Sequence, residues 1–333
     1  MLTKKDNMDL FLANREVEHI PISFWHHFVS FHDHYMALEK EGILDKVIEG
    51  QKSTIFKYKP DFVKVMSDGF FGHPSIWEND INEIEDLEKI ISVGPNHEWI
   101  EAQIKYVNEI LNNCPDDVYY FYNIFSPLQY IRLKFEEYDE DFSKFSAMFI
   151  ENPQAMLKAA GNICNDIKEL VRRLFEETKI DGVYYSVQNV QHELADSSFH
   201  KKYVEVSDLE LLNEIRKYTN KVLLHICGYG NYKNDLKLYA HYPVEAVNWA
   251  VFTENISLGE GKKIFKKPVF GGFDNKMGSI LYEGTKEELT RYIKKLLDDS
   301  GTIGVAIGAD CTVSDTLSSQ QVELINQIVS DYK

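Results

Sequence analysis

Apolar and polar positions follow two different patterns along the chain. Short apolar runs rich in β-branched and aromatic residues recur over its whole length, and longer charged stretches between them carry apolar residues at three- and four-residue spacing. The first pattern predicts buried strands, and the second predicts amphipathic helices. Eight runs have the character of strands: residues 20–28, 62–68, 118–125, 182–188, 221–228, 246–252, 268–274 and 301–310.

The helical pattern fills the intervals between these runs. It is clearest in residues 82–93, 96–113, 156–179, 209–218 and 285–300. Strands that alternate with helices predict a parallel sheet, and eight such units predict a single (β/α)₈ TIM barrel with an N-terminal helical extension. No linker rich in Pro, Gly or Ser divides the chain, so residues 1–333 are expected to form one domain.

The alternation within the run 221–228 places polar chemistry inside the predicted barrel. Val222, Leu224 and Ile226 share one face of this strand, while His225 and Cys227 share the other. The uniformly apolar face should pack against helices, so His225 and Cys227 should point inward. They stand at the C-terminal end of the strand, which is where barrels of this type build their active sites.

The last predicted strand raises a specific problem for Cys311. Strict alternation puts Ala306, Gly308 and Asp310 on the inward face, and it therefore points Cys311 outward. If Cys311 is to meet His225 and Cys227, the strand must end or bulge near Gly308.

Composition and charge exclude several classes of partner. The 333 residues carry a formal charge of −17 and show no basic stripe, which argues against nucleic-acid binding. No run of about 18 apolar residues occurs, and the N-terminus lacks the apolar core of a signal peptide. A soluble, cytoplasmic protein is therefore expected, and four cysteines in such a chain do not suggest a disulfide framework.

His225, Cys227 and Cys311 together offer one imidazole and two thiolates. This ligand set suits zinc and leaves a fourth position free for a substrate. Each residue also has a simpler interpretation, because a cysteine in a strand is often a small buried hydrophobe and a histidine is often a satisfied core residue. If zinc is bound, two protein thiolates keep the site near neutral and make a further bound sulfur nucleophilic, which favours alkylation of a thiol.

The same residues carry a resemblance to a known family. The segments HICG around Cys227 and GADC around Cys311 resemble the zinc ligands of methylcobamide:thiol methyltransferases, a branch of the uroporphyrinogen decarboxylase superfamily. DFVKVMSD, which ends at Asp68, and PVFGGFDN at 268–275 are similar to the second-strand and seventh-strand segments of that superfamily. The resemblance covers nearly the whole chain and implies a barrel, Zn²⁺, and a corrinoid methyl donor or acceptor carried on a partner protein.

The decarboxylase branch of the superfamily fits less well. It uses arginines after the first strand to hold its polycarboxylate substrate, whereas this chain has SFWHHFVSFHDHY there and no arginine between Arg15 and Arg132. Arginine is the residue suited to bidentate carboxylate recognition. The sequence therefore favours methyl transfer to or from a small thiol, with the identity of the thiol and the direction of transfer left open.

Other polar residues stand where the predicted strands end. Asp68 follows Lys64 at the same parity, so it is either a catalytic carboxylate at the mouth or the partner of Lys64 in an internal ion pair. His26 and His27 follow the first run and are candidates for substrate binding or for partly solvated packing.

Three further candidates for substrate binding lie at strand ends. Gln188 ends the fourth run, and Asn189 follows it directly. Asp274 ends the seventh run, where it could instead stabilise the turn.

Three hypotheses remain from the sequence. The first is a zinc-dependent, corrinoid-linked methyltransferase. The second is a metal-free decarboxylase of a different acid that uses Asp68, and the third is a catalytically silent barrel that serves as a binding module. No phosphate-binding loop or nucleophile elbow supports a nucleotide-dependent enzyme or a serine hydrolase.

Overall fold

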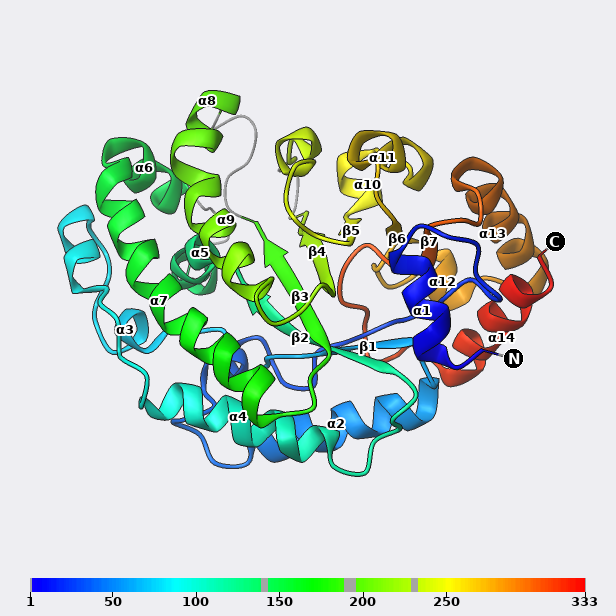
Figure 1. Cartoon of the computed structure of the whole chain (residues 1–333), viewed down its shortest axis with the longest axis horizontal. Coiled ribbons are helices and arrows are strands. Elements are labelled where there is room, and N and C mark those ends of the chain that lie inside the picture. Colours follow the sequence, from blue (N-terminus) through cyan, green and yellow to red (C-terminus); the bar gives the residue numbers. More distant parts are fainter. Residues whose placement is uncertain (1, 139–142, 189–195, 229–232, 333) are drawn as a thin grey trace.

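Seven parallel strands form one curled sheet in chain order in this computed structural model (Figure 1). The structure describes residues 2–138, 143–188, 196–228 and 233–332. The strands are β1 (Phe62–Val65), β2 (Tyr119–Phe125), β3 (Gly182–Val187), β4 (Val222–Ile226), β5 (Ala246–Trp249), β6 (Val269–Phe273) and β7 (Val305–Ala309). Each falls inside a run predicted from the sequence, and helices lie outside the sheet.

Helices of very different length connect the strands (Figure 1). The longer ones have one apolar stripe that packs on the sheet, as in α4, α7 and α13. The α-helices are α1 (Lys4–Leu12), α2 (Ile43–Tyr58), α3 (Pro74–Trp77), α4 (Glu98–Leu111), α5 (Pro127–Tyr138), α6 (Ser143–Glu151), α7 (Pro153–Glu177), α8 (Ser197–Phe199), α9 (Glu205–Ile215), α10 (Val251–Glu254), α11 (Leu258–Phe265), α12 (Ile280–Glu283), α13 (Lys286–Ser300) and α14 (Ser319–Ser330). The other helical turns are η1 (His32–Tyr35), η2 (Ile84–Lys89), η3 (His200–Val204) and η4 (Leu236–Tyr239).

The predicted helix at 82–93 is wrong in extent, because only the short 3₁₀ turn η2 forms there. No helix among the described residues is long and apolar enough to cross a membrane.

The prediction of eight strands is also corrected. Residues 20–28 form only isolated parallel bridges, of Ile22 with Ile307 and of His26 with Val313. The Ser23 N–H donates to Ile307 O on one side, and Ile22 O accepts from Asp61 N–H on the other. This buried segment thus connects the two edge strands, β7 and β1, without a continuous ladder to either, and the barrel is TIM-like with seven strands in its described part.

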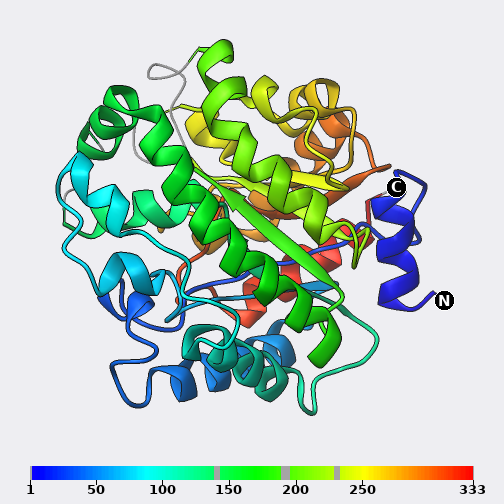
Figure 2. The same cartoon turned by 60° about the vertical axis from the view of Figure 1, so that its left-hand side comes forward.

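The interior of the barrel has an apolar lower layer. Phe62, Phe121, Tyr184, Leu223 and Phe270 project from β1, β2, β3, β4 and β6 into one buried cluster, which Ala246 of β5 joins. The predicted N-terminal helix forms as α1, whose Met8 and Phe11 join the same cluster and are fully buried. Figure 2 shows α1 at the end where β3 begins, so the bottom of the barrel is sealed and its polar chemistry lies at the opposite end.

Candidate metal centre and cavity

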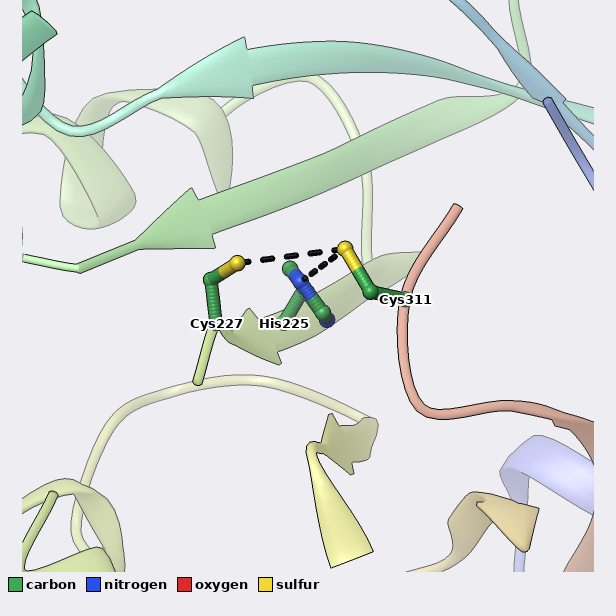
Figure 3. A group of neighbouring side chains, drawn as sticks. All are labelled: His225, Cys227 and Cys311. Atoms are coloured by element: carbon green, nitrogen blue, oxygen red, sulfur yellow. Dashed lines mark hydrogen bonds between the residues drawn. The ribbon is translucent and has the colours of Figure 1, made fainter. Parts of the chain in front are cut away.

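Three side chains converge at the C-terminal mouth of the barrel (Figure 3). His225 projects inward from β4, and Cys227 follows one residue beyond its end. The Cys311 sulfur lies 3.8 Å from the Cys227 sulfur and 3.6 Å from His225 Nε2. Residues 84 and 86 positions apart in sequence are therefore brought to one point.

Cys311 reaches this point because β7 ends at Ala309. The Asp310 N–H still donates to Phe273 O, but the chain bends at Asp310 and Cys311, and the Val313 N–H then donates to Trp25 O. The strand thus stops where the sequence required a departure from regular geometry. After β7 the backbone thus leaves its pairing with β6 and crosses the mouth of the barrel toward Trp25. The Cys311 side chain points inward.

A neighbouring asparagine fixes the orientation of His225. Asn248 on β5 is directly paired with His225 in the register of the sheet. Its amide nitrogen donates to Phe270 O and Ala309 O, so its oxygen faces His225 Nδ1 at 2.5 Å and must accept a hydrogen bond from the Nδ1–H. Nε2 is consequently left with a lone pair directed toward the sulfur of Cys311, as a metal-binding histidine requires.

A glycine makes this contact between strands possible. Gly271 on β6 has φ of +136°, and a Cβ at this position would lie 2.8 Å from the Asn248 amide nitrogen. The glycine in PVFGGFD therefore allows Asn248 to approach the backbone of β6.

The spacing of the three donor atoms fits zinc. Tetrahedral bonds of about 2.3 Å to sulfur and about 2.0 Å to nitrogen separate two sulfurs by about 3.8 Å and a sulfur from a nitrogen by about 3.5 Å. The observed 3.8 and 3.6 Å match these values, and all three donor atoms lie within 4.8 Å of one another. The residues of this site therefore suit a tetrahedral metal with one open position.

The electrostatics of the site favour thiolates. The hydrogen bond from Cys227 lowers the pKa of Cys311 well below its usual range, and His225 and Lys64 act in the same direction against the effect of burial. Lys64 is buried, which lowers its pKa to about 8, while the two cysteines and Asp68 pull that pKa upward. A cation thus lies close to two sulfurs that can become anionic.

The three donors border a cavity of about 370 Å³. Its floor is polar and includes Lys64, Asn123, Ser186 and Gln188, whereas one wall is aromatic and apolar. That wall is formed by Phe31, Phe71, Phe125 and Leu133. Such a mixture of an apolar wall and a few polar groups is typical of small-molecule sites.

Asp68 lies behind this cavity and has a different partner from the one considered in the sequence. Its carboxylate accepts hydrogen bonds from His27 Nδ1 at 2.8 Å and from the Phe28 N–H at 2.9 Å. Lys64 instead holds its ammonium 4.2 Å from the centre of the Tyr184 ring, and no ion pair joins it to Asp68 within the described residues. Burial opposes ionisation of Asp68, but its interaction with His27 holds its pKa below the usual range.

The other predicted substrate-binding residues take different places. His27 and Gln188 border the cavity, and the Gln188 Nε2 has no hydrogen-bond partner among the described residues. His26 does not border it: its ring packs on Phe28 and Tyr58, beside a second hollow.

Asp274 lies outside the cavity lining and accepts from the Lys276 N–H, a contact that stabilises the turn after β6. Asn189 lies outside the described residues.

Two residues visible in the sequence have roles that only the structure assigns. Asn248 shares the inward parity of His225 on the next strand along the chain, but its support of His225 depends on its contacts with β6 and β7. His34 belongs to the histidine-rich segment after the first run, but its place beside His27 depends on the path of residues 29–35 over the mouth.

Comparison with known proteins gives structural matches only. No protein-family model matches the sequence, and no curated protein matches it. A methyltransferase from Methanosarcina mazei has a TM-score of 0.72 at 11% identity, with 99% of this chain and 98% of that chain covered. A B12-independent methionine synthase from Shewanella sp. W3-18-1, in complex with selenomethionine, has a TM-score of 0.54 at 12% identity, with 94% and 98% covered.

A β-mannanase from the blue mussel Mytilus edulis has a TM-score of 0.51 at 12% identity, with 93% of this chain and 92% of that chain covered. These likenesses show the fold alone. A barrel that also occurs in a glycosidase does not specify a reaction, so any function must be argued from the site itself.

Proposed function

We propose that this protein is a zinc-dependent methyltransferase that moves a methyl group between a corrinoid, carried on a partner protein, and a small thiol. The observation that carries the proposal is the convergence of His225, Cys227 and Cys311 beside a cavity, with a sulfur–sulfur and a sulfur–nitrogen distance that fit tetrahedral zinc. The likeness to a protein described as a methyltransferase, over nearly the full length of both chains, agrees with it.

His225, Cys227 and Cys311 would hold the metal. Zinc in such a site supplies a Lewis acid that lowers the pKa of a bound thiol while leaving its sulfur nucleophilic. Asn248 keeps the Nε2 lone pair of His225 available by accepting a hydrogen bond from the Nδ1–H.

Lys64 would balance charge when a third sulfur enters. Two protein thiolates already neutralise a divalent ion, so an additional thiolate gives the site a net negative charge. The Lys64 ammonium is close enough to Cys227 and Cys311 for their charges to raise its pKa, and it therefore favours an anionic third sulfur.

The polar lining would orient the rest of the thiol. Gln188 has a free donor at the cavity, and His27 borders it with Asp68 behind. We retain Asn189 as a further substrate contact only in this proposal, whereas His26 and Asp274 lie outside the cavity lining and are left without that role. The methylated corrinoid would approach from the open side of the mouth, because α1 closes the other end of the barrel.

The decisive experiment combines spectroscopy at the zinc edge with a methyl-transfer assay. Zinc-loaded protein is mixed with 2-mercaptoethanesulfonate or homocysteine, and X-ray absorption should show an additional sulfur in place of a light atom. The same protein should demethylate methylcobalamin in the presence of the effective thiol, and Cys311→Ala should not. If no thiol alters the zinc coordination and methylcobalamin is unchanged across the panel, a decarboxylase or a binding module becomes the better assignment.

A further inference from the structure

A histidine–carboxylate pair stands on the wall of the cavity outside the proposed metal site. Asp68 is fully buried, and His27 is one-third exposed at its side chain. The hydrogen bond of 2.8 Å joins Asp68 Oδ1 to His27 Nδ1. The carboxylate is not part of the cavity lining, whereas the ring of His27 is. The pair is thus arranged with its carboxylate at the back and its imidazole at the front.

The surroundings fix the protonation pattern of this pair. Asp68 Oδ2 accepts the Phe28 N–H, so the carboxylate is ionised and held in place by the backbone. An ionised carboxylate can only accept, and His27 Nδ1 must therefore carry the proton. Nε2 on the other side of the ring remains available to exchange a proton with a molecule in the cavity.

The charged neighbours of His27 leave Asp68 as its main electrostatic partner. His34 packs on the ring at 4.2 Å, but burial lowers its pKa to about 4, so it is neutral near pH 7. Burial also lowers the pKa of the adjacent His26. On its outer side His27 borders the second hollow, whose charged groups are Asp33, Lys46 and Asp315.

A second pair in the protein shows why the position matters. His73 Nε2 lies 3.0 Å from Asp166 Oδ2, and its Nδ1 lies 2.9 Å from Ser75 Oγ. Both ring nitrogens are therefore occupied, and the ring has no exposed surface. This pair can only hold α3 and α7 together. His27 differs because its ring is one-third exposed and borders a cavity that Cys227 and Cys311 also border.

We infer that His27 is the proton acceptor for the incoming thiol and that Asp68 is its positioning residue, an inference that rests on the proposed function. The S–H bond breaks, its proton passes to His27 Nε2, and the sulfur electron pair forms the new bond to the methyl carbon. The electron pair of the cobalt–carbon bond stays on cobalt, which is reduced from Co(III) to Co(I). His27 and the two cysteines border the same cavity of about 370 Å³, so the proton can pass within this cavity, directly or through water.

The test counts protons during thiol binding. Zinc-loaded wild type is titrated calorimetrically with 2-mercaptoethanesulfonate near pH 7, in buffers that differ in ionisation enthalpy. If His27 retains the proton, wild type should release clearly less than one proton to the buffer, and His27→Gln should release about one. Asp68→Asn should move the release toward that of His27→Gln and shift the pH profile of methyl transfer.

His26→Gln is the matched control. It alters the neighbouring histidine, which does not border the cavity, and should release as few protons as wild type. Methyl transfer by His27→Gln should fall about 10²- to 10⁴-fold, the range of a lost general base.

The outcomes separate the two proposals. Thiol binding with equal proton release in wild type and His27→Gln would overturn the role of His27 alone. Loss of a metal ion from His27→Gln would also overturn it, because His27 would then be a ligand. Absence of thiol binding to zinc-loaded wild type would overturn the proposed function together with this inference.

Discussion

The four cysteines fall into two pairs that differ in position and in surroundings. Cys164 lies in the middle of α7 with no exposed surface, and burial raises its pKa to about 12. Cys114 follows α4, donates to Ile110 O, and also has its pKa raised by burial. Cys227 and Cys311 instead stand at the ends of strands beside a cavity, and the pKa of Cys311 is lowered.

The difference shows what turns a thiol into a ligand. Cys114 and Cys164, the core pair, belong to the hydrophobic core, whose apolar side chains disfavour the thiolate. The strand-end cysteines share a histidine and a nearby lysine, which favour it. Position within the barrel, and not the presence of cysteine, therefore determines where metal chemistry is expected.

The largest expected effect is loss of zinc on removal of a strand-end cysteine. Cys227→Ala and Cys311→Ala each remove one of three protein ligands, so zinc affinity should fall more than about 100-fold, beyond the range found for residues that only support a ligand. Zinc content of protein purified without chelator measures this. Circular dichroism should show that the barrel stays folded, since its core does not depend on the metal.

Cys164→Ala is the control for this comparison. It removes the sulfur of one core cysteine and should leave the zinc content unchanged. Full zinc occupancy in Cys227→Ala would show that Cys227 is not a zinc ligand and that this metal site does not exist as described. Zinc loss in Cys164→Ala would show that the two pairs are not independent.

A smaller effect is expected in thiol alkylation of the metal-free protein. An ordinary thiol with a pKa near 8.5 is only about 3 per cent ionised at pH 7, so a Cys311 that is largely thiolate should react up to about 30-fold faster from ionisation alone. Because its pKa is lowered, its rate should stay nearly constant as pH falls from 8.5 to 7. Rates at Cys114 and Cys164, whose pKa values are raised, should fall about tenfold per pH unit.

Mass spectrometry of iodoacetamide-labelled peptides resolves the four sites. Added zinc should protect Cys227 and Cys311 from alkylation and leave the rates at Cys114 and Cys164 unchanged. A Cys311 rate that declines tenfold per pH unit would contradict the lowered pKa.

The smallest expected effect concerns the support of His225. Asn248→Ala removes the acceptor of the His225 Nδ1–H hydrogen bond but leaves all three ligands, and zinc affinity should fall about tenfold, the lower end of the range for residues behind a ligand. Competition with a chromogenic chelator measures the affinity. Asn123→Ala is the control, because Asn123 also faces inward but bonds Ser67 and Ser186. Equal affinities in the two variants would show that the tautomer of His225 needs no such support.

The sequence predicted the inward placement of His225 and Cys227 because the alternation of side chains along a strand is enough for it. Alternation along β4 put His225 and Cys227 on the inward face, and the same rule identified Cys311 as the residue that needs a strand to stop. The residues behind the site were harder. Asn248 acts through hydrogen bonds to β6 and to the end of β7, which no pattern within its own strand reveals.

The absence of a regular strand at residues 20–28 and the pairing of Asp68 with His27 have a common physical origin. Residues 20–28 are apolar and alternate like a strand, but Ile22 and Ser23 bond to different neighbours and so form no continuous ladder. Near the end of this segment His27 reaches Asp68, 41 positions later. Local pattern specifies that such residues are extended and buried, whereas their partners depend on how the two edges of the sheet meet.

The sealed lower end of the barrel has a kinetic consequence. With Met8 and Phe11 of α1 and the aromatic layer above them filling the interior, every molecule must enter and leave the cavity by the mouth. A partner protein seated over that mouth would trap whatever lies beneath it. Addition should therefore be ordered, with the small molecule first and the macromolecule second, and the methylated product should depart only after the macromolecule has gone.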